Sequence, residues 1–400
     1  MPDILRALRH RNYRLYFSGQ LVSLAGTWMQ MIAMSWLTYR LTNSTLMLGL
    51  VSFAGQIPIL AVAPLGGVLS DRFDKRLMML WTQSLAMAQA SLLAILTLTD
   101  TIQPWQLILM ALFLGLINAI DTPTRQSFLV DLVDNRDDLP NAIALNSFTM
   151  NSARFLGPSI GGIVVGLAGE GVCFVFNALS YLAVILALWA MRTRHQARVP
   201  QPAGEALRQG CRYAFGIPQI RQLLYLVAAT SFFATPYVVL LPYFAREVYA
   251  GGAQTFGFMS ASAGGGALLG TIYLASRRSV VGLDRVIGNA MLSAGCAVAL
   301  FAGSRLLAVA MPALAVLGFS IICIIASSNT LIQSIVKDDM RGRVMALFTV
   351  AFLGIAPLGS LTAGWMAHQF GARGTLLGCS LAILAAGIAF IRLRRPYAGL

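Results

Sequence analysis

The sequence is organised as a succession of apolar stretches, each near 20 residues long, separated by short polar segments. As an α-helix rising 1.5 Å per residue, a stretch of this length spans the ~30 Å hydrocarbon core of a bilayer. The composition agrees, because 57% of the residues are hydrophobic and only 11% are charged, whereas soluble domains carry about 25% charged residues. The pattern predicts an all-α integral membrane protein.

Twelve such stretches can be placed, with boundaries accurate to a few residues. They are 15–39, 46–69, 77–99, 105–127, 141–168, 172–191, 221–245, 255–276, 286–304, 307–335, 343–368 and 374–391. The longest polar segment follows the sixth span and is basic. We therefore predict an N-terminal six-helix bundle (1–192), a cytoplasmic linker (193–220) with an amphipathic helix near 203–215, and a C-terminal six-helix bundle (221–400).

Basic residues gather on alternate loops, which fixes the expected orientation. One set of loops carries most of the arginines and lysines, whereas the other set holds only Arg40, Arg246, Arg305 and Arg373. By the positive-inside rule, both termini are cytoplasmic. The net charge of +14 then reflects membrane topology, and we expect no nucleic-acid partner. The five cysteines and three histidines are scattered, so we expect no metal and no cofactor.

The two sides of the linker repeat each other weakly. Gly49 in the second span lies 208 residues before Gly257 in the eighth, and Gln126 lies 207 residues before Gln333. Pro158 in the fifth span aligns with Pro357 in the eleventh. A parallel repeat of six spans is typical of a two-bundle transporter with its site between the halves.

The loop after the second span, GGVLSDRFDKR, resembles the signature of the major facilitator superfamily in that loop. The matching positions are Gly67, Asp71, Arg72, Lys75 and Arg76. Asp74 stands where the family has a second glycine. The resemblance covers essentially the whole chain and implies the major facilitator fold.

In that family, the loop gates conformational change. The resemblance implies that Asp71 lies near the N-terminus of the eleventh span, where the helix dipole favours negative charge. It also implies that Arg76 engages an acid near the end of the fourth span, and both Asp121 and Asp131 qualify. The alternative is that these basic residues only set the topology.

The fifth span contains GPSIGG, which resembles the helix-five motif of antiporting exporters in the superfamily. Gly157, Pro158, Gly161 and Gly162 match, whereas Ala153 replaces a further glycine. Small residues let two membrane helices approach closely, and a proline bends a helix. The alternative is ordinary packing of small residues.

Three charged residues inside spans are functional candidates. Asp121 and Arg125 share one helix face beside Pro123, with Asp121 roughly 24 Å from the outer start of its span. Asp121 is either a proton carrier or half of a structural ion pair. Arg154 lies about 20 Å from the cytoplasmic start of its span, too deep to reach either surface easily. It faces either an anionic group of the substrate in a water-filled cavity or polar partners such as Asn146.

The resemblance also implies that the first, fourth, seventh and tenth spans line the transport path. Polar and aromatic candidates there are Gln20, Ser23, Trp28, Gln30, Asn118, Thr122, Thr230, Thr235, Tyr237, Ser327, Ser328, Asn329 and Gln333. Each could equally form a hydrogen bond between helices.

The segments RNYRLYFSGQLVSLAGTWMQ, DTPTRQSFLVDLV, NAIALNS and MRGRV resemble the bacterial exporter branch that includes enterobactin exporters and macrolide efflux proteins. The resemblance implies a secondary active transporter of the bacterial inner membrane. It would export a small amphipathic siderophore- or drug-like compound by proton antiport with alternating access, as a monomer. A proton-coupled importer and a lysolipid-moving transporter are the alternatives. No HExxH motif occurs and the three histidines are far apart in the sequence, so we do not expect an enzyme.

Overall fold

The computed structural model describes residues 3–133, 135–191, 203–277 and 279–393, with side chains throughout except at 3–4, 63–71, 136 and 203–208. These ranges contain helices and no strand. The first six long helices are α1 (Arg11–Thr42), α2 (Thr45–Arg72), α3 (Lys75–Leu98), α4 (Pro104–Asp131), α5 (Leu139–Ala168) and α6 (Glu170–Ala190). The later ones are α7 (Ala203–Gly216), α8 (Pro218–Phe233), α9 (Tyr237–Tyr243), α10 (Ala253–Ser276), α11 (Leu283–Gly303), α12 (Leu307–Ile335), α13 (Arg341–Thr349), α14 (Ala356–Phe370) and α15 (Ala372–Leu393).

Four short segments complete the described chain. Two are 3₁₀-helices, η1 (Asp3–Arg9) and η2 (Arg136–Asp138). Two are π-helical and lie inside longer helical runs, η3 (Phe244–Val248) after α9 and η4 (Val350–Gly354) between α13 and α14. A turn at 234–236 joins α8 to α9 in the continuous run 218–248, which η3 ends, and η4 joins α13 to α14 in the run 341–370.

Ten helical segments of the described chain are long and apolar enough to cross a membrane. They include the two composite runs 218–248 and 341–370. Helices α1 and α5 have 32 and 30 residues but are not among the ten, since both carry charged and amide side chains. Together these helices coincide with the twelve predicted spans. The prediction of an all-α, multi-pass membrane protein is therefore confirmed.

The chain forms two compact units. Unit 1 contains residues Met1–Thr42, Ile57–Gln201 and Gly252–Gly257, and unit 2 contains Asn43–Gln56, Pro202–Gly251 and Phe258–Leu400. Each unit thus includes a short piece of the other sequence half: the start of α2 belongs to unit 2, and the start of α10 to unit 1.

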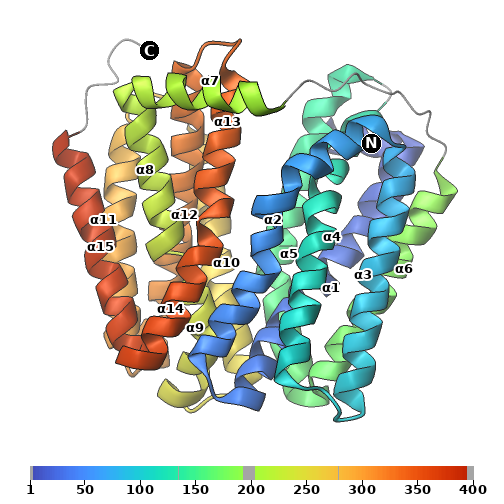
Figure 1. Ribbon diagram of the computed structural model, residues 1–400, viewed down its shortest axis with the longest axis vertical. Helices are drawn as coiled ribbons and strands as arrows, with labels where there is room; N and C mark the ends of the chain where they lie inside the picture. Colours follow the sequence, from blue (N-terminus) through green and yellow to red (C-terminus); the bar gives the residue numbers. More distant parts are fainter. Residues whose placement is uncertain (1–2, 134, 192–202, 278, 394–400) are drawn as a thin grey trace. The chain divides into compact units, whose positions relative to one another are not determined.

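In unit 1, α1 packs against α5 and α6, and α3 packs against α4 and α6 (Figure 1). Small residues set the closest approach. A Cβ atom at Gly19 would lie 3.2 Å from the Cα of Val184, and one at Gly26 would lie 2.6 Å from the hydroxyl of Ser180. An apolar cluster that includes Tyr13, Phe128 and Leu188 closes one end of the unit.

In unit 2, α11 packs against α12 and α15, and α7 lies across the ends of α8 and α13 (Figure 1). The predicted linker helix is therefore confirmed as a helix. It is attached to the start of α13 by Arg343, which donates to the side chain of Gln209 over 2.8 Å. A Cβ atom at Gly210 would lie 2.9 Å from the Cβ of Arg343, so α7 and α13 are in close contact.

Candidate transport site

Asp121 lies in the interior of unit 1 and is only 3% exposed. One carboxylate oxygen, Oδ1, accepts hydrogen bonds from the Thr82 hydroxyl at 2.7 Å and from the Gln83 amide at 2.9 Å. The other oxygen, Oδ2, lies 3.7 Å from Nε of Arg125. A buried carboxylate needs hydrogen bonds or a counter-charge, and Asp121 has both.

The surroundings of this pair come from three helices. Arg125 of α4 also reaches α1, where its Nη1 lies 3.5 Å from Oε1 of Gln20. Two amide atoms here are buried without a hydrogen-bond partner among the described residues, Nε2 of Gln20 and Oε1 of Gln83. The sequence identified Asp121 and Arg125 but missed Thr82 and Gln83, although adjacent polar residues in an apolar span were a usable signal. Pro123 lies inside α4, which continues to Asp131.

The loop between α2 and α3 makes different contacts from those the resemblance implied. Asp131, at the end of α4, pairs with Lys75 at 2.6 Å. Arg76 instead donates to the backbone carbonyls of Leu188 and Trp189, at 2.7 and 2.9 Å. These carbonyls belong to the last turn of α6, where unpaired acceptors and the helix dipole attract a cation.

Asp74 has a local role that explains the departure from the family pattern. Its carboxylate accepts hydrogen bonds from the backbone N–H groups of Arg76 and Leu77, at 2.8 and 3.1 Å, and so caps α3. Arg72 is exposed at the end of α2. Gly67 and Asp71 lie within 63–71, where the structure describes the helix but not the side chains. The contact expected for Asp71 therefore stays a prediction.

Gln30 belongs to a buried network inside unit 1. Its amide donates to Gln89 of α3 at 3.0 Å and its carbonyl accepts from Asn177 of α6 at 2.7 Å. The hydroxyl of Ser180 donates to the Asn177 side chain at 3.1 Å. This arrangement joins α1, α3 and α6, and both ends of the Gln30 amide have a protein partner.

The helix-five residues pack on two different helices. A Cβ atom at Gly157 would lie 2.4 Å from the Cβ of Trp28, and one at Gly161 would lie 3.0 Å from the Cα of Met29, both on α1. A Cβ atom at Gly162 would lie 2.7 Å from the Cα of Gly257 on α10. Pro158 is buried between these contacts. Within unit 1, the small residues therefore let α5 approach α1 and the start of α10.

Unit 2 contains a second crossing of the same geometry. A Cβ atom at Gly364 of α14 would lie 2.8 Å from the Cα of Gly49 and 2.7 Å from the carbonyl oxygen of Thr45. At Gly162 the corresponding neighbours are Gly257 and Ala253, each 208 residues further along than Gly49 and Thr45. The structure thus bears out the repeat between Gly49 and Gly257.

The register of the fifth and eleventh spans differs from the sequence alignment. Pro158 and Ser360 are the residues whose carbonyl oxygens face Gly257 and Gly49, so the counterpart of Pro158 is Ser360 and not Pro357. The sequence alignment pairs the two prolines by residue type, whereas the register is set by the residues that meet at each helix crossing.

Arg154 lies one turn before Gly157 and is exposed. Its guanidinium carbon is 5.9 Å from the centroid of the Trp28 ring. Among the described residues, no carboxylate lies within ion-pair distance of Arg154. Two further candidates in unit 1, Asn118 of α4 and Asn146 of α5, are half-buried and make no side-chain hydrogen bond to the described residues. These side chains are available for a ligand.

In unit 2, the candidates Asn329 and Gln333 lie one turn apart on α12. The amide of Gln333 donates to the side-chain oxygen of Asn329. Asn329 is half-buried and Gln333 is exposed. The neighbouring Ser327 and Ser328 are buried, and their hydroxyls have no hydrogen-bond partner in the described part of the chain.

Similarity to known proteins covers nearly the entire chain. The model of the family described as transmembrane secretion effector matches residues 4–399. The staphyloferrin A transporter of Staphylococcus aureus is 25% identical over 364 residues, which cover 90% of each chain. The multidrug efflux pump Tap of Mycobacterium tuberculosis is 25% identical over 389 residues, covering 95% of this chain and 92% of the pump.

A crystal structure of the nucleoside transporter NupG shares the fold, with a TM-score of 0.71 at 15% identity over 96% of this chain and 98% of that one. The predicted resemblance to the major facilitator superfamily is confirmed. One conclusion follows from three findings: the apolar helices long enough to span a membrane, the shared fold, and the family match over residues 4–399. The chain belongs to the transmembrane secretion effector family, and it is a multi-pass major facilitator transporter of the bacterial inner membrane that handles a small-molecule substrate.

Proposed function

We propose that the protein exports a small amphipathic compound, siderophore- or drug-like and bearing an anionic group, by proton antiport with alternating access. Two relatives support the cargo class, since one is named a staphyloferrin A transporter and the other a multidrug efflux pump. The GPSIGG residues on α5 support export. Their tight packing on α1 and on the start of α10 is what an exporter-type seal requires.

The observation that carries the proposal is the contact between Arg154 and Trp28. A guanidinium 5.9 Å from the ring centroid is held by a cation–π interaction, which leaves its N–H donors free to meet an anion. A charge deep in a membrane protein is costly unless it faces a counter-charge or a water-filled cavity. An anionic cargo would supply the counter-charge, and its aromatic or apolar part could contact Trp28.

Asp121 is the proposed proton site. Thr82 and Gln83 hold Oδ1, so a proton would be taken up on Oδ2, the oxygen that faces Arg125. Once Asp121 is neutral, Arg125 loses its counter-charge and its contact with Gln20 becomes the stronger one. Proton binding would thereby weaken the link between Asp121 and Arg125 and strengthen that between α1 and α4.

Transport into inverted membrane vesicles tests the proposal. Vesicles that contain the protein would be given labelled siderophores, macrolides and lysolipids under an inside-acid pH gradient. We expect uptake of a siderophore- or drug-like anion that an uncoupler abolishes and that Arg154→Gln strongly reduces. Vesicles with Arg285→Gln, which alters a basic residue at the start of α11, serve as the matched control.

The same assay separates the competing functions. Uptake confined to right-side-out vesicles would identify an importer, and movement of lysolipids alone would identify a lipid transporter. Either result contradicts the exporter proposal. We further propose that the transporter acts as a monomer, which activity after reconstitution at one protein per liposome would establish.

A further inference from the structure

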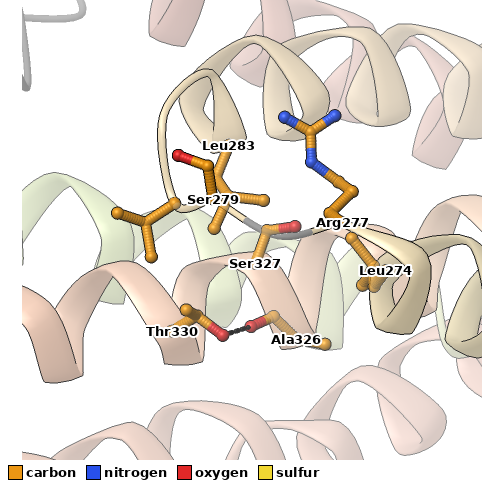
Figure 2. Close-up of a pocket in the computed structure, with 8 residues that line it drawn as sticks. Leu274, Arg277, Ser279, Leu283, Ala326, Ser327 and Thr330 are labelled. Carbon is orange, nitrogen blue, oxygen red and sulfur yellow. Dashed lines mark hydrogen bonds between the residues drawn. The ribbon is translucent and has the colours of Figure 1, made fainter.

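A pocket of about 210 Å³ lies in unit 2, and one residue of its lining, Ser327, is among the transport-path candidates named above. Its walls are the end of α10, the segment that leads into α11, and residues 326–330 of α12. In Figure 2, Arg277, Ser279 and Leu283 lie on one side and Ser327 and Thr330 of α12 on the other. Ligand pockets for drug-sized molecules occupy roughly 300–1,000 Å³, so this space suits a small polar group.

Two polar atoms at the pocket have no hydrogen-bond partner among the described residues. Ser327 is 1% exposed, and its hydroxyl makes no hydrogen bond to the described residues. Nε of Arg277 is likewise buried and unpaired among them. Buried polar atoms are nearly always hydrogen-bonded. A hydroxyl and a guanidinium N–H, both unsatisfied beside one cavity, therefore indicate that an acceptor is missing from it.

The guanidinium of Arg277 is positioned by its remaining nitrogens. Nη1 donates to the hydroxyl of Tyr273 at 3.2 Å, and Nη2 donates to the carbonyl of Val281 at 3.0 Å. Both acceptors are uncharged, so the positive charge is not neutralised by these bonds. In the described part of the chain, no carboxylate lies within ion-pair distance of Arg277.

In the corresponding region of unit 1, the basic residue has a carboxylate partner. There Lys75, just after α2, pairs with Asp131 at the end of α4. The acid at the equivalent place in the second repeat, Asp338, pairs with Arg341 at 2.7 Å. The carboxylate that would match Asp131 thus pairs with Arg341, and Arg277 keeps its charge without a carboxylate partner among the described residues.

The N-terminus of α11 adds to the positive potential. Its first residues follow Gly282, which has φ of 80° and provides no side-chain cap. The N–H groups of Leu283, Arg285 and Val286 already donate to backbone carbonyls, so the helix start favours an anion through its dipole and not through free donors. Asp284 lies in the first turn of α11 but does not line the pocket.

The pocket lies near the expected cytoplasmic surface. Ser327 precedes the end of α12 by eight residues, which corresponds to about 12 Å along the helix. This depth is close to the level of the lipid headgroups. Basic pockets between membrane helices on the cytoplasmic side can hold anionic headgroups.

We propose that this pocket binds a phosphate group, presented by an anionic phospholipid of the cytoplasmic leaflet or by free phosphate. Nε of Arg277 and the hydroxyl of Ser327 donate to the phosphate oxygens, and the start of α11 contributes its dipole. Thr330 is a weaker candidate because its hydroxyl already donates to the carbonyl of Ala326 at 3.0 Å.

Thermal unfolding of the purified transporter in detergent tests the proposal without any transport assay. Samples would be titrated with short-chain phosphatidylglycerol, short-chain phosphatidylcholine and inorganic phosphate. We expect phosphatidylglycerol to raise the unfolding temperature in a saturable way, whereas phosphatidylcholine gives a smaller rise. Saturation by inorganic phosphate at a similar concentration would assign the site to the free anion.

Two variants locate the binding. Arg277→Gln and Ser327→Ala should each weaken the phosphate-dependent stabilisation, about tenfold or more in apparent affinity for Arg277→Gln because a charged hydrogen bond is lost. Arg285→Gln should leave it unchanged. Equal losses for Arg277→Gln and Arg285→Gln would mean non-specific attraction and would overturn the proposal. If the single variants Ser327→Ala and Arg277→Gln both retain full affinity for phosphate, the proposal is overturned as well. Because Ser327→Ala removes only one buried oxygen, it should fold even if Arg277→Gln does not.

Discussion

Gly157 and Trp28 are in such close contact that a Cβ atom at position 157 would lie 2.4 Å from the Cβ of the tryptophan. The ring of the same tryptophan lies beneath the guanidinium of Arg154. The first glycine of the helix-five motif therefore determines where Trp28 lies, and Trp28 in turn supports Arg154. The motif and the charge of Arg154, which the sequence shows only as neighbours, are linked through a residue of α1.

Replacing Gly157 by alanine should disrupt this contact. Contacts below 3.0 Å to a Cβ atom require something to shift, and overpacking of this kind costs roughly 1–3 kcal/mol. We expect a lower unfolding temperature and reduced transport. The matched control is Gly378→Ala in α15, where the added methyl group meets nothing within 4 Å. Equal behaviour of the two variants would show that the close approach at Gly157 has no importance.

The two glycine crossings should respond alike. Gly162→Ala and Gly364→Ala both add a Cβ atom less than 3.0 Å from the backbone of a glycine on the partner helix, Gly257 or Gly49. Because backbone atoms move less readily than side chains, both variants should lose transport activity while Gly378→Ala retains it. Full activity in either variant would contradict a role for that crossing in the transport cycle.

Trp28 should influence anionic cargo selectively. Trp28→Leu removes the aromatic face under Arg154, and a cation–π contact contributes about 0.5–2 kcal/mol. We expect roughly a two- to thirtyfold rise in the apparent KM for an anionic cargo and little change for a neutral one. Trp28→Phe should recover part of the loss. The check is initial-rate uptake into inverted vesicles, and an equal loss for neutral and anionic cargo would argue against the assignment.

Asp121→Asn should separate transport from the proton gradient. The asparagine oxygen can still accept from Thr82 and Gln83, so the local packing is preserved, but it takes up no proton. We expect cargo counterflow to persist while uptake driven by the pH gradient disappears. Asp131→Asn is the control, since that acid pairs with Lys75 outside this cluster and should leave gradient-driven uptake in place. Gradient-driven uptake at the normal rate in Asp121→Asn would refute the proton assignment.

The ion pair between Lys75 and Asp131 should contribute little to stability. The side chain of Asp131 is 40% exposed and that of Lys75 is 10% exposed, so water screens the pair from the side of Asp131, and solvent-exposed ion pairs are worth about 0–1 kcal/mol. A double-mutant cycle with Lys75→Met and Asp131→Asn, read by thermal unfolding, should give a coupling energy below about 1 kcal/mol. A much larger value would indicate that the pair locks the helices together.

The partners of the polar side chains could not be predicted from the sequence. Gln30 resembled a cavity residue, but its amide is bound by Gln89 and Asn177. Arg76 resembled the partner of an acid, yet Lys75 fills that position. In lipid, hydropathy does not distinguish a helix face that meets a neighbour from one that meets the bilayer, because both are apolar. Which polar groups meet therefore depends on helix rotation and on contacts between distant parts of the chain.

The sequence by itself determined the helical, membrane-spanning class, the positions of the spans and the repeat that relates Gly49 to Gly257. The hydrocarbon thickness fixes span length, and an unsatisfied backbone is too costly in lipid for other structures. Only the tertiary structure decided that Thr82 and Gln83 hold Asp121, that Trp28 supports Arg154, and that Ser360 is the counterpart of Pro158. These relationships arise from close approach of helices at glycines, which sets the rotation and register of each helix against its neighbours.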